Sequence, residues 1–316
     1  MKIFNGDLNK IALQSSDLSF SYLEIQKISE FLSDILPSSD IYGLPAFNDI
    51  STNLIYLALL YNKCTFLIFD PSILKNKNSF INSIGLNKII SSKDLNPLDQ
   101  NCFIKEISID EKFNLCLYKQ DLDNKEIRTN SPSILLNTSG SSGTPKIVRI
   151  SYQNLISNTL GITKSLNLTC QDKSISTLPL FYTYGLSILN THMFTGGTFY
   201  ITDHSILKKS FADELSLFKP TLFSGVPSTY EILRKIDYLH LRHPFIRKIT
   251  QAGGALDLDI QKEILSICAS KKDFYIMYGQ TEATARISCF NLRNYPRKIG
   301  SVGLPLDNLS IEINDK

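Results

Sequence analysis

The stretch SILLNTSGSSGTPKIVRIS, residues 133–151, indicates a strand, a loop of small residues and a second strand. Residues 134–136 form a short apolar run, and residues 147–150 favour a strand again. Between them, residues 138–144 are all Gly, Ser or Thr, so closely spaced backbone N–H groups can surround an anion. Lys146 at the loop exit adds a positive charge. This pattern predicts a phosphate-binding loop in preference to a plain Gly/Ser turn of a hairpin.

The loop differs from the P-loop of kinases and GTPases, in which Gly-Lys is followed by Ser or Thr and by a helix. Here Thr144 and Pro145 separate Gly143 from Lys146, and Ile147 follows the lysine. Proline and the β-branched residues behind it favour a strand at the exit rather than a helix. We therefore expect a loop that leads back into a sheet.

The segment YGQTEATAR, residues 278–286, is the second candidate for phosphate chemistry. Tyr278 offers a flat face to a base, Thr281 offers a hydroxyl group and Glu282 offers a carboxylate. Phosphate transfer needs a divalent cation, and Mg²⁺ prefers a carboxylate together with phosphate oxygens. The alternative interpretation is a helix start, at which Thr281 and Glu282 favour the positive end of the helix dipole.

These two motifs resemble those of the adenylate-forming superfamily, which includes acyl-CoA synthetases, luciferases and the adenylation domains of peptide synthetases. The first loop is similar to the family pattern YTSGTTGxPKGV and departs from it at Asn137, Ser141, Ser142 and Ile147. The second motif matches the four fixed positions of the pattern YGxTE. The resemblance runs in family order over about residues 10–313. Three further segments show the resemblance: Gly225-Val226-Pro227-Ser228, Gly253-Gly254-Ala255 and the GSVGLPL block at residues 300–306.

The resemblance implies both a fold and a reaction. The fold would be α/β, with two stacked, mixed and mostly parallel sheets flanked by helices, as in the large N-terminal domain of these enzymes. The reaction would join a small carboxylic acid to ATP, with ATP and Mg²⁺ as cofactors, giving an acyl-adenylate and pyrophosphate. The acyl group would then pass to a thiol, either that of coenzyme A or the phosphopantetheine of an acyl-carrier protein. The chain would accordingly be an acid–thiol ligase.

The same resemblance implies roles for individual residues. Catalysis would involve Thr138, Thr281 and Glu282, with Glu282 as the Mg²⁺ ligand. The implied nucleotide-binding residues are Thr138, Ser139, Gly140, Ser141, Ser142, Gly143, Lys146, Gly253, Gly254, Ala255, Tyr278, Gly279, Gln280 and Thr281. The implied substrate-binding residues are Tyr182, Tyr184, Gly185, Gly225, Val226 and Gly254.

The surroundings of Tyr182 and Tyr184 bear on the class of acid. In the family, peptide-synthetase adenylation domains hold the substrate α-ammonium with an Asp in this neighbourhood, and here no Asp or Glu lies between Asp172 and Asp203. Because an unpaired buried ammonium is costly, we favour an acid without a free α-amino group. An amino-acid-activating domain and a nucleotide-binding module without catalysis stay open as alternatives, as does a purely structural role of both tyrosines.

The rest of the chain predicts an α/β organisation, with an N-terminal subdomain at residues 1–130 and a nucleotide- and acyl-binding subdomain at residues 131–316. The first expected helix begins at a Ser21–Glu24 capping box and buries Ile28, Phe31, Leu32 and Ile35. Further helices are expected at residues 52–61 and 151–166, and another ends at residues 81–86. Two more are expected to begin at a Ser228–Glu231 capping box and at a cap formed by Asp257. Expected strands are residues 65–69, 88–91, 175–178, 221–223, 248–251 and 274–277, and residues 95–130 are expected to be irregular or an edge. If the later strands are parallel, the loops behind them would form a ligand site.

The composition is that of a globular protein. Hydrophobic residues make up 43%, and the net charge of +3 gives no basis for binding nucleic acid or an anionic membrane surface. The apolar run at residues 54–69 is broken by Asn62 and Lys63, so it predicts a buried helix and strand rather than a membrane span. The first residues carry no hydrophobic signal core and the six cysteines are scattered, so we expect reduced thiols and a cytoplasmic protein.

The family's next sequence blocks are an Asp that holds the ribose, a hinge and a small C-terminal domain with a catalytic Lys. These blocks do not occur before Lys316. We therefore expect a fragment of a longer enzyme or a natural half, which would fold and bind nucleotide but form the adenylate slowly.

Overall fold

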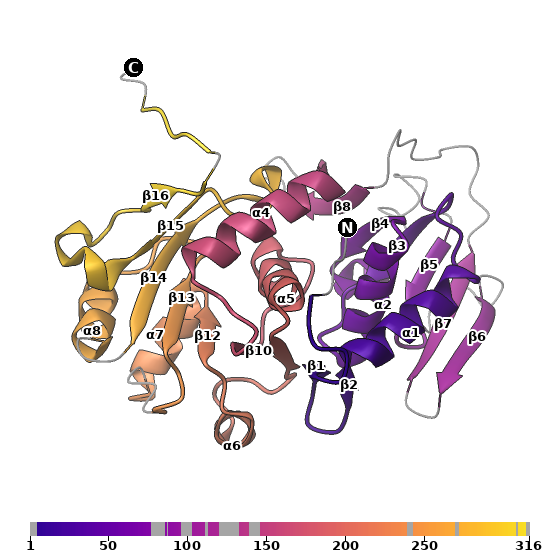
Figure 1. Ribbon diagram of the computed structural model, residues 1–316, viewed down its shortest axis with the longest axis horizontal. Helices are drawn as coiled ribbons and strands as arrows, with labels where there is room; N and C mark the ends of the chain where they lie inside the picture. The colour runs from indigo at the N-terminus through magenta and orange to yellow at the C-terminus, as the bar shows by residue number, and fades with distance from the viewer. Residues whose placement is uncertain are drawn as a thin grey trace. The chain divides into compact units, whose positions relative to one another are not determined.

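The computed structural model describes residues 5–76, 86, 88–95, 103–110, 113–119, 133–138, 146–238, 243–268, 272–307 and 309–313. The chain divides into two compact units (Figure 1). Unit 1 is formed chiefly by Asp7–Leu155 together with Pro179–Tyr182, and unit 2 chiefly by Ile156–Leu178 and Thr183–Lys316. The chain passes between the units near residue 155 and again on either side of Pro179–Tyr182, whereas the expected subdomain boundary at residues 130–131 stays a prediction.

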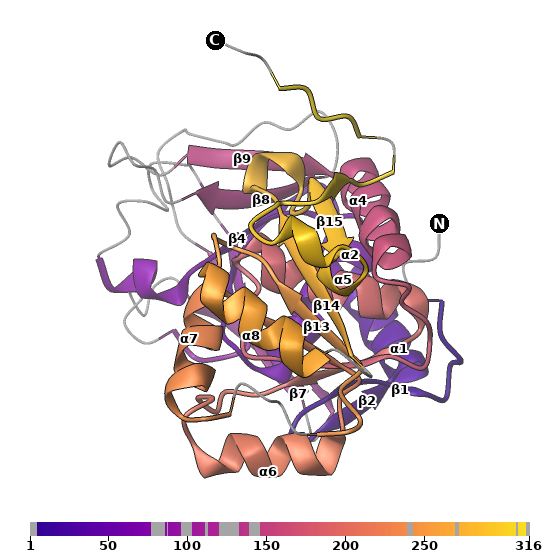
Figure 2. The ribbon, with the colours of Figure 1, turned by 90° about the vertical axis from the view of Figure 1, so that its left-hand side faces the viewer.

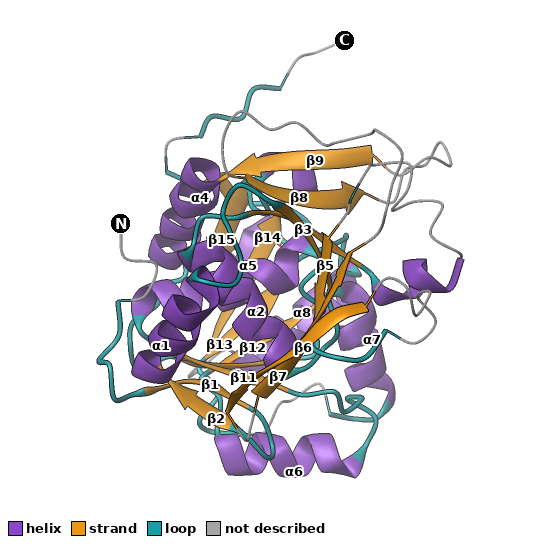
Figure 3. Cartoon of the chain, turned by 90° about the vertical axis from the view of Figure 1, so that its right-hand side faces the viewer, coloured by secondary structure: helices purple, strands orange, loops and turns teal. Residues whose placement is uncertain are grey.

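Unit 1 contains a sheet with the strand order β6-β7-β5-β3-β4-β8-β9 (Figure 3). Its strands are β3 (Ile41–Pro45), β4 (Thr65–Phe69), β5 (Lys88–Ser91), β6 (Phe103–Asp110), β7 (Phe113–Lys119), β8 (Ser133–Thr138) and β9 (Lys146–Ser151). The central strands β5, β3, β4 and β8 run parallel, and the outer pairs are antiparallel. All residues of β4 are buried, in keeping with the unbroken apolar run at residues 66–69.

The described part of unit 1 also contains the antiparallel pair β1 (Ile11–Gln14) and β2 (Ser19–Ser21), the helices α1 (Tyr22–Ser33) and α2 (Ile50–Tyr61), and the 3₁₀ helix η1 (Pro71–Asn76). The predicted capping box of α1 is present, since Ser21 Oγ accepts from the Glu24 N–H at 3.2 Å and Glu24 Oε2 accepts from the Ser21 N–H at 2.7 Å. The predicted buried stripe holds for Ile28 and Leu32 but is wrong for Phe31, which is 45% exposed. Phe31 lies off the inward face, which is filled at spacings of three and four residues.

In unit 2 the strands follow the order β16-β15-β14-β13-β12-β10-β11. They are β10 (Lys173–Ser176), β11 (Thr198–Ile201), β12 (Leu222–Gly225), β13 (Lys248–Gln251), β14 (Asp273–Tyr278), β15 (Ser288–Asn291) and β16 (Leu304–Pro305). The strands from β11 to β14 run parallel, and β15 and β16 are antiparallel additions. The helices are α4 (Tyr152–Ser165), which spans the passage between the units, α5 (Thr183–Thr195), α6 (Lys209–Phe218), α7 (Pro227–Lys235) and α8 (Leu258–Cys268), with the 3₁₀ helices η3 (Thr281–Ala283), η4 (Leu292–Asn294) and η5 (Pro296–Lys298).

Successive strand residues of this sheet point to opposite faces, and the two faces have different characters. Phe223, Ile249 and Ile276 point into a hydrophobic core that α6, α7 and α8 complete (Figure 2). The residues next to them in sequence, Ser224, Thr250 and Met277, line a cavity together with residues of α4 and α5. The second face, which carries Ser224 and Thr250, is therefore the more polar one.

The predicted α/β fold is confirmed. The strands expected at residues 65–69, 88–91 and 248–251 occur at those residues, and the other expected strands overlap β10, β12 and β14. Residues 81–85, where a helix end was expected, lie outside the described residues. Residues 95–130 include β6 and β7, and β6 forms the expected edge.

The prediction of a Ser228–Glu231 capping box is wrong, because α7 begins at Pro227, which suits the first turn of a helix. Thr229 Oγ1 accepts from the Val226 N–H at 3.3 Å instead. The prediction for α8 is confirmed, since Asp257 Oδ1 accepts from the N–H of Ile260 at 3.1 Å. No helix in the described part of the chain is long and apolar enough to cross a membrane.

Candidate functional site

The strands β8 and β9 hold the two ends of the predicted phosphate loop. They pair antiparallel with Thr138 opposite Lys146, so the chain enters and leaves the loop at adjacent positions of one sheet. The exit is a strand, as expected, and not the helix of a P-loop. The predicted loop residues Ser139, Gly140, Ser141, Ser142 and Gly143 lie outside the described residues. Their role in phosphate binding therefore stays a prediction.

Three parallel strands of unit 2 end beside one another, β12 at Gly225, β13 at Gln251 and β14 at Tyr278. Because the carboxyl ends of parallel strands share one edge of a sheet, the loops behind them face one region. Gly253 has a φ of 85°, a conformation that favours glycine, and a β-carbon on it would lie 3.2 Å from Val226 Cγ1. The structure thus brings together the loops after β12 and β13 that the sequence singled out.

Gly253, Gly254 and Ala255 are exposed, and we call them the small-residue wall. Gln251, which is only 2% exposed, supports the wall because its Nε2 donates to the Gly254 carbonyl oxygen at 2.7 Å. A β-carbon on Gly254 would approach Pro227 Cγ to 3.2 Å. The wall therefore presents backbone and small side chains to solvent on a fixed support, which would let a flat ligand approach closely.

Gly225 and Gly185, both predicted to contact substrate, are buried. A β-carbon on Gly225 would lie 2.9 Å from both Thr229 Cγ2 and Tyr230 Cε2. The absence of a side chain thus allows α7 to pack against the end of β12. Gly185 lies in the buried first turn of α5. The geometry gives Gly225 a packing role, and its contact with substrate stays a prediction.

The segment from Tyr278 to Arg286 folds back tightly on itself. The Tyr278 carbonyl accepts from the Ile287 N–H at 2.8 Å, and a β-carbon on Gly279 would lie only 1.7 Å from the Ala285 carbonyl oxygen. Thr284 and Ala285 have φ values of 58° and 93°, which are rare for residues with side chains. Strain of this kind is found at functional sites, where the surrounding structure maintains it.

Thr281 and Glu282 lie in η3, at the outer turn of this loop. Glu282 is exposed, and none of the ion pairs among the described residues includes it. Within the same residues no group of three or more acidic, His or Cys side chains gathers to hold a metal. One exposed carboxylate fits a Mg²⁺ ion held mainly by phosphate oxygens and water, and it does not fit an all-protein metal cage.

The two tyrosines predicted to line an acid pocket have different surroundings. Tyr182 belongs to unit 1 and is 59% exposed, and the centre of its ring lies 4.5 Å from the centre of the Phe181 ring. Tyr184 lies in the first turn of α5 in unit 2, and its hydroxyl donates to the Thr250 carbonyl at 3.0 Å. Burial raises the pKa of Tyr184, so its hydroxyl is a neutral donor at neutral pH.

A buried network of hydroxyl groups surrounds Thr250. The Thr250 Oγ1 lies 2.8 Å from both the Tyr184 hydroxyl and Ser224 Oγ. The Thr250 carbonyl accepts a second phenol hydrogen bond from Tyr230 at 2.6 Å. These bonds satisfy polar groups that would otherwise be costly to bury, and they fix the positions of the side chains on the polar face of the sheet.

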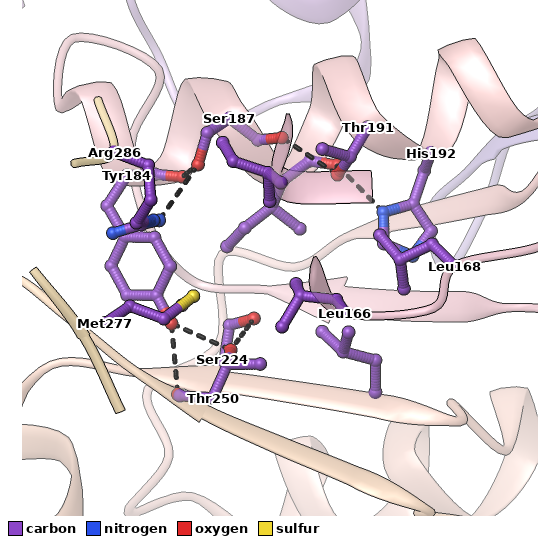
Figure 4. Close-up of a pocket in the computed structure, with 13 residues that line it drawn as sticks. Leu166, Leu168, Tyr184, Ser187, Thr191, His192, Ser224, Thr250, Met277 and Arg286 are labelled. Atoms are coloured by element: carbon purple, nitrogen blue, oxygen red, sulfur yellow. Dashed lines mark hydrogen bonds between the residues drawn. The ribbon is translucent and has the colours of Figure 1, made fainter. Parts of the chain in front are cut away.

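A cavity in unit 2 lies between this face of the sheet and residues of α4 and α5. The centre of a water-sized sphere can occupy about 10 Å³ of the cavity. The space between its lining atoms amounts to about 240 Å³, part of which is open to solvent. Figure 4 shows Tyr184 and Arg286 at one end and Leu168 and His192 at the other. The first end is cationic and hydroxylated, and Leu166 and Leu168 contribute apolar parts of the lining.

Arg286 ends the YGQTEATAR segment and is 2% exposed. Its Nη2 donates to Ser187 Oγ at 3.3 Å, and its Cζ lies 4.8 Å from the centre of the Tyr184 ring. Asn158 Nδ2 donates to the Arg286 carbonyl at 2.7 Å and holds the backbone. Burial lowers the pKa of Arg286.

The sequence motifs assign no role to Arg286, Ser187 or Thr250. Arg286 could have been noticed as the only cation in a segment of small residues directly behind Glu282. Ser187 and Thr250 carry no such signal, because a hydroxyl on a helix or strand does not reveal which face it occupies.

The sequence matches the family described as AMP-binding enzyme over residues 41–316. It is 30% identical to the oxalate–CoA ligase of Saccharomyces cerevisiae over 184 residues, which cover 56% of this chain and 32% of the ligase. It is 24% identical to the 2-succinylbenzoate–CoA ligase of Lactococcus lactis, with 94% and 64% of the two chains covered. It is 27% identical to a plipastatin synthase chain of Bacillus subtilis, with 88% and 11% covered. The chain thus spans less than two thirds of the length of each of these relatives.

Solved structures show the same fold. The o-succinylbenzoate CoA synthetase (MenE) of Bacillus subtilis, in complex with an acyl-adenylate intermediate, has a TM-score of 0.75 at 19% identity, covering 97% of this chain and 63% of that chain. VinN has a TM-score of 0.73 at 19% identity, covering 98% and 80%. Since the family match extends over most of the sequence and the fold agrees with it, this chain belongs to the family of AMP-binding enzymes.

Proposed function

We propose that this chain is the ATP- and acid-binding portion of an adenylate-forming acid–thiol ligase. The observation that carries the proposal is the position of Glu282, an exposed carboxylate without an ion pair among the described residues. It lies in a strained loop behind β14, and the small-residue wall lies behind the neighbouring strand β13. Membership of the family and the similarity to CoA ligases support the same reaction class.

In this proposal the adenine and ribose lie against the small-residue wall and Tyr278, which is 44% exposed. Gln280, exposed in the same loop, would flank the nucleotide. The carbonyl and N–H groups of an exposed Gly-Gly-Ala segment can approach a base without side chains between them. Thr138, Lys146 and the residues between them keep the role that the sequence suggests, which is binding of the β- and γ-phosphates.

The proposed chemistry begins with attack of a carboxylate oxygen on the α-phosphorus of ATP. The bond between the α-phosphorus and the bridging oxygen breaks, and pyrophosphate leaves with the electron pair. Thr281 would donate a hydrogen bond to an α-phosphate oxygen, and Glu282 would hold Mg²⁺. When bound, Mg²⁺ would neutralise charge on the phosphates.

In the second step of the proposal a thiolate attacks the acyl carbon, and AMP leaves. The thiol would belong to coenzyme A or to the phosphopantetheine of an acyl-carrier protein. The similarity to CoA ligases favours coenzyme A.

An amino-acid-activating domain is the second candidate, and the similarity to the plipastatin synthase chain favours it. Such a domain would need an acidic group for the substrate ammonium, because a buried ammonium without one is costly. No Asp or Glu lines the cavity beside Tyr184 in the described part of unit 2. We therefore keep the acid without a free α-amino group as the proposed substrate.

A nucleotide-binding module without catalysis is the remaining alternative. In that case the cellular function of the protein would not depend on Glu282, and a strain carrying Glu282→Ala would show no phenotype. The ligase proposal expects that strain to behave as one from which the gene has been deleted.

The proposed function is tested by acid-dependent exchange of labelled pyrophosphate into ATP, measured for the wild type and for Glu282→Gln. We expect slow exchange from residues 1–316 and a further loss of at least about 100-fold in Glu282→Gln, because charge stabilisation at the phosphates is removed. Glu231→Gln, which changes another exposed carboxylate on α7, serves as the control and should retain exchange. Exchange that is equal in Glu282→Gln and the wild type would overturn the proposal.

A further inference from the structure

We propose that Arg286 recognises a second carboxylate on the acid, so that the substrate is a short dicarboxylic acid rather than a simple fatty acid. This inference rests on the proposed function, since it names the class of acid that the site would take. It concerns a side chain to which the reaction itself assigns no role.

The first observation is that Arg286 is buried without an anionic partner. It is 2% exposed, and no ion pair found in the described part of the chain includes it. Its polar contacts are one hydroxyl, Ser187 Oγ at 3.3 Å, and the face of the Tyr184 ring. Its Nε is buried and has no hydrogen-bond partner in the described structure. A guanidinium has five donors, and buried charges are ordinarily paired.

The second observation is that Arg286 lies at a cavity. Arg286, Tyr184, Ser187 and Thr250 all line it, and Figure 4 shows Arg286 beside the Tyr184 ring and Ser187. Among the described residues no carboxylate lines the cavity. An acidic group of a ligand bound there would therefore provide the anionic partner that the guanidinium lacks. The forked donors of Arg match the two oxygens of a carboxylate, which favours this group over other polar groups.

The third observation is the size of the cavity. About 10 Å³ is open to the centre of a water molecule, which is room for one water-sized group at the narrow part. The wider space of about 240 Å³ is partly continuous with solvent. A cavity this small favours a short acid over a long acyl chain, for which Leu166 and Leu168 would have to move.

The fourth observation is the place of Arg286 in the chain. It directly follows the strained residues Thr284 and Ala285, and the Asn158 Nδ2 bond to its carbonyl fixes the backbone. Glu282 lies in the same loop. The loop thus carries one acidic group outward, where Mg²⁺ and phosphate would be, and one basic group inward, where the distal end of the acid would be.

The experiment compares acids in matched pairs, each pair differing by a carboxylate in place of a methyl group: malonate with propionate, succinate with butyrate, and glutarate with valerate. Pyrophosphate exchange is measured with the wild type and with Arg286→Gln, Arg286→Lys and Arg293→Gln. Arg293 is a surface residue paired with Asp273 at 3.3 Å and serves as the matched control. Circular dichroism melts establish that each variant is folded.

We expect the wild type to have a KM at least about 30-fold lower for one dicarboxylate than for its monocarboxylate partner, the size expected for a buried charged contact. Arg286→Gln should raise the KM for that dicarboxylate to the value of the monocarboxylate and leave the monocarboxylate within about threefold of the wild type. Arg286→Lys should fall between them, and Arg293→Gln should match the wild type. Equal KM values within every pair in the wild type would overturn the inference and leave the proposed function intact.

If no acid supports exchange, the proposed function fails, and the inference is then decided by binding alone. Thermal melts with succinate or glutarate should show a rise in Tm for the wild type that is absent in Arg286→Gln. No rise in the wild type, or the same rise in both proteins, would overturn the role of Arg286. If Arg286→Gln does not fold, the comparison rests on Arg286→Lys, in which a KM for the dicarboxylates unchanged from the wild type would overturn it.

Discussion

At the scale of single residues, the site depends on a close approach of backbone to backbone at Gly279. A β-carbon there would lie 1.7 Å from the Ala285 carbonyl oxygen, a separation that no pair of non-bonded atoms adopts. Gly279 therefore allows the loop to turn so tightly that Glu282 points outward and Arg286 returns to the interior. The positive φ values of Thr284 and Ala285 complete the turn.

This geometry predicts a large effect of Gly279→Ala. The loop would have to open, so we expect a loss of about 1–3 kcal/mol in the free energy of unfolding and a loss of most pyrophosphate exchange. Gly254→Ala is the matched comparison, because its β-carbon would only approach Pro227 Cγ to 3.2 Å, and it should cost less than half as much. Urea denaturation of both variants measures the difference, and equal stability of the two would show that the loop is not tightly closed.

At the scale of elements, the strands that carry the site are held together at their opposite ends by Asp172. Its side chain is 2% exposed and accepts from the Thr169 N–H at 2.9 Å and the Thr221 hydroxyl at 2.9 Å, with Lys248 Nζ at 3.1 Å. These residues precede or begin β10, β12 and β13. Burial alone would raise the pKa of Asp172, but the Thr169 and Lys248 contacts outweigh it and lower the pKa below 3.8.

Asp172→Asn should therefore destabilise the protein in a way that depends on pH. At pH 7 we expect the free energy of unfolding to fall by about 3 kcal/mol, because the buried charge of Lys248 would lose its partner. Since the pKa of Asp172 is lower in the folded than in the unfolded state, its contribution is fully present above pH 3.8 and is lost as the pH falls through the folded value.

The urea midpoints of the wild type and Asp172→Asn, measured between pH 7 and pH 3, should thus converge at the acid end. Asp259→Asn alters an exposed carboxylate whose pKa is lowered by its hydrogen bond and charge contact with Lys262, and it should leave the midpoint at pH 7 unchanged. A difference between the wild type and Asp172→Asn that persists undiminished at pH 3 would contradict this role.

Elements with strong local signals were predicted well from the sequence. The strand β4 has an unbroken apolar run, and α1 has a complete capping box, so both were located correctly. Two elements that were not predicted lack such a signal: β11 has only four residues, and α6 begins after Lys208 without a capping side chain. The outward position of Phe31 shows the same limit, since apolar residues at helical spacing do not reveal how wide the buried face is.

At the scale of the whole molecule, the sequence identified the family and the loops behind β12, β13 and β14, because small residues and a carboxylate behind apolar strands are visible in a single sequence. It did not identify the cavity beside Arg286, because that cavity is formed by helices and strands separated by more than a hundred residues, as the Asn158–Arg286 hydrogen bond illustrates. The surroundings of Arg286 were therefore accessible only from the fold.

If a carboxylate oxygen attacks the α-phosphorus of ATP, as we propose, one oxygen atom of the acid is transferred to AMP. The protein is incubated with ATP, Mg²⁺, hydroxylamine as acceptor and an acid labelled with ¹⁸O in its carboxylates, and the AMP is analysed by mass spectrometry. We predict that each AMP formed carries one ¹⁸O atom and that Glu282→Gln forms little labelled AMP. Unlabelled AMP, or ADP with ¹⁸O in inorganic phosphate, would overturn the proposed attack on the α-phosphorus.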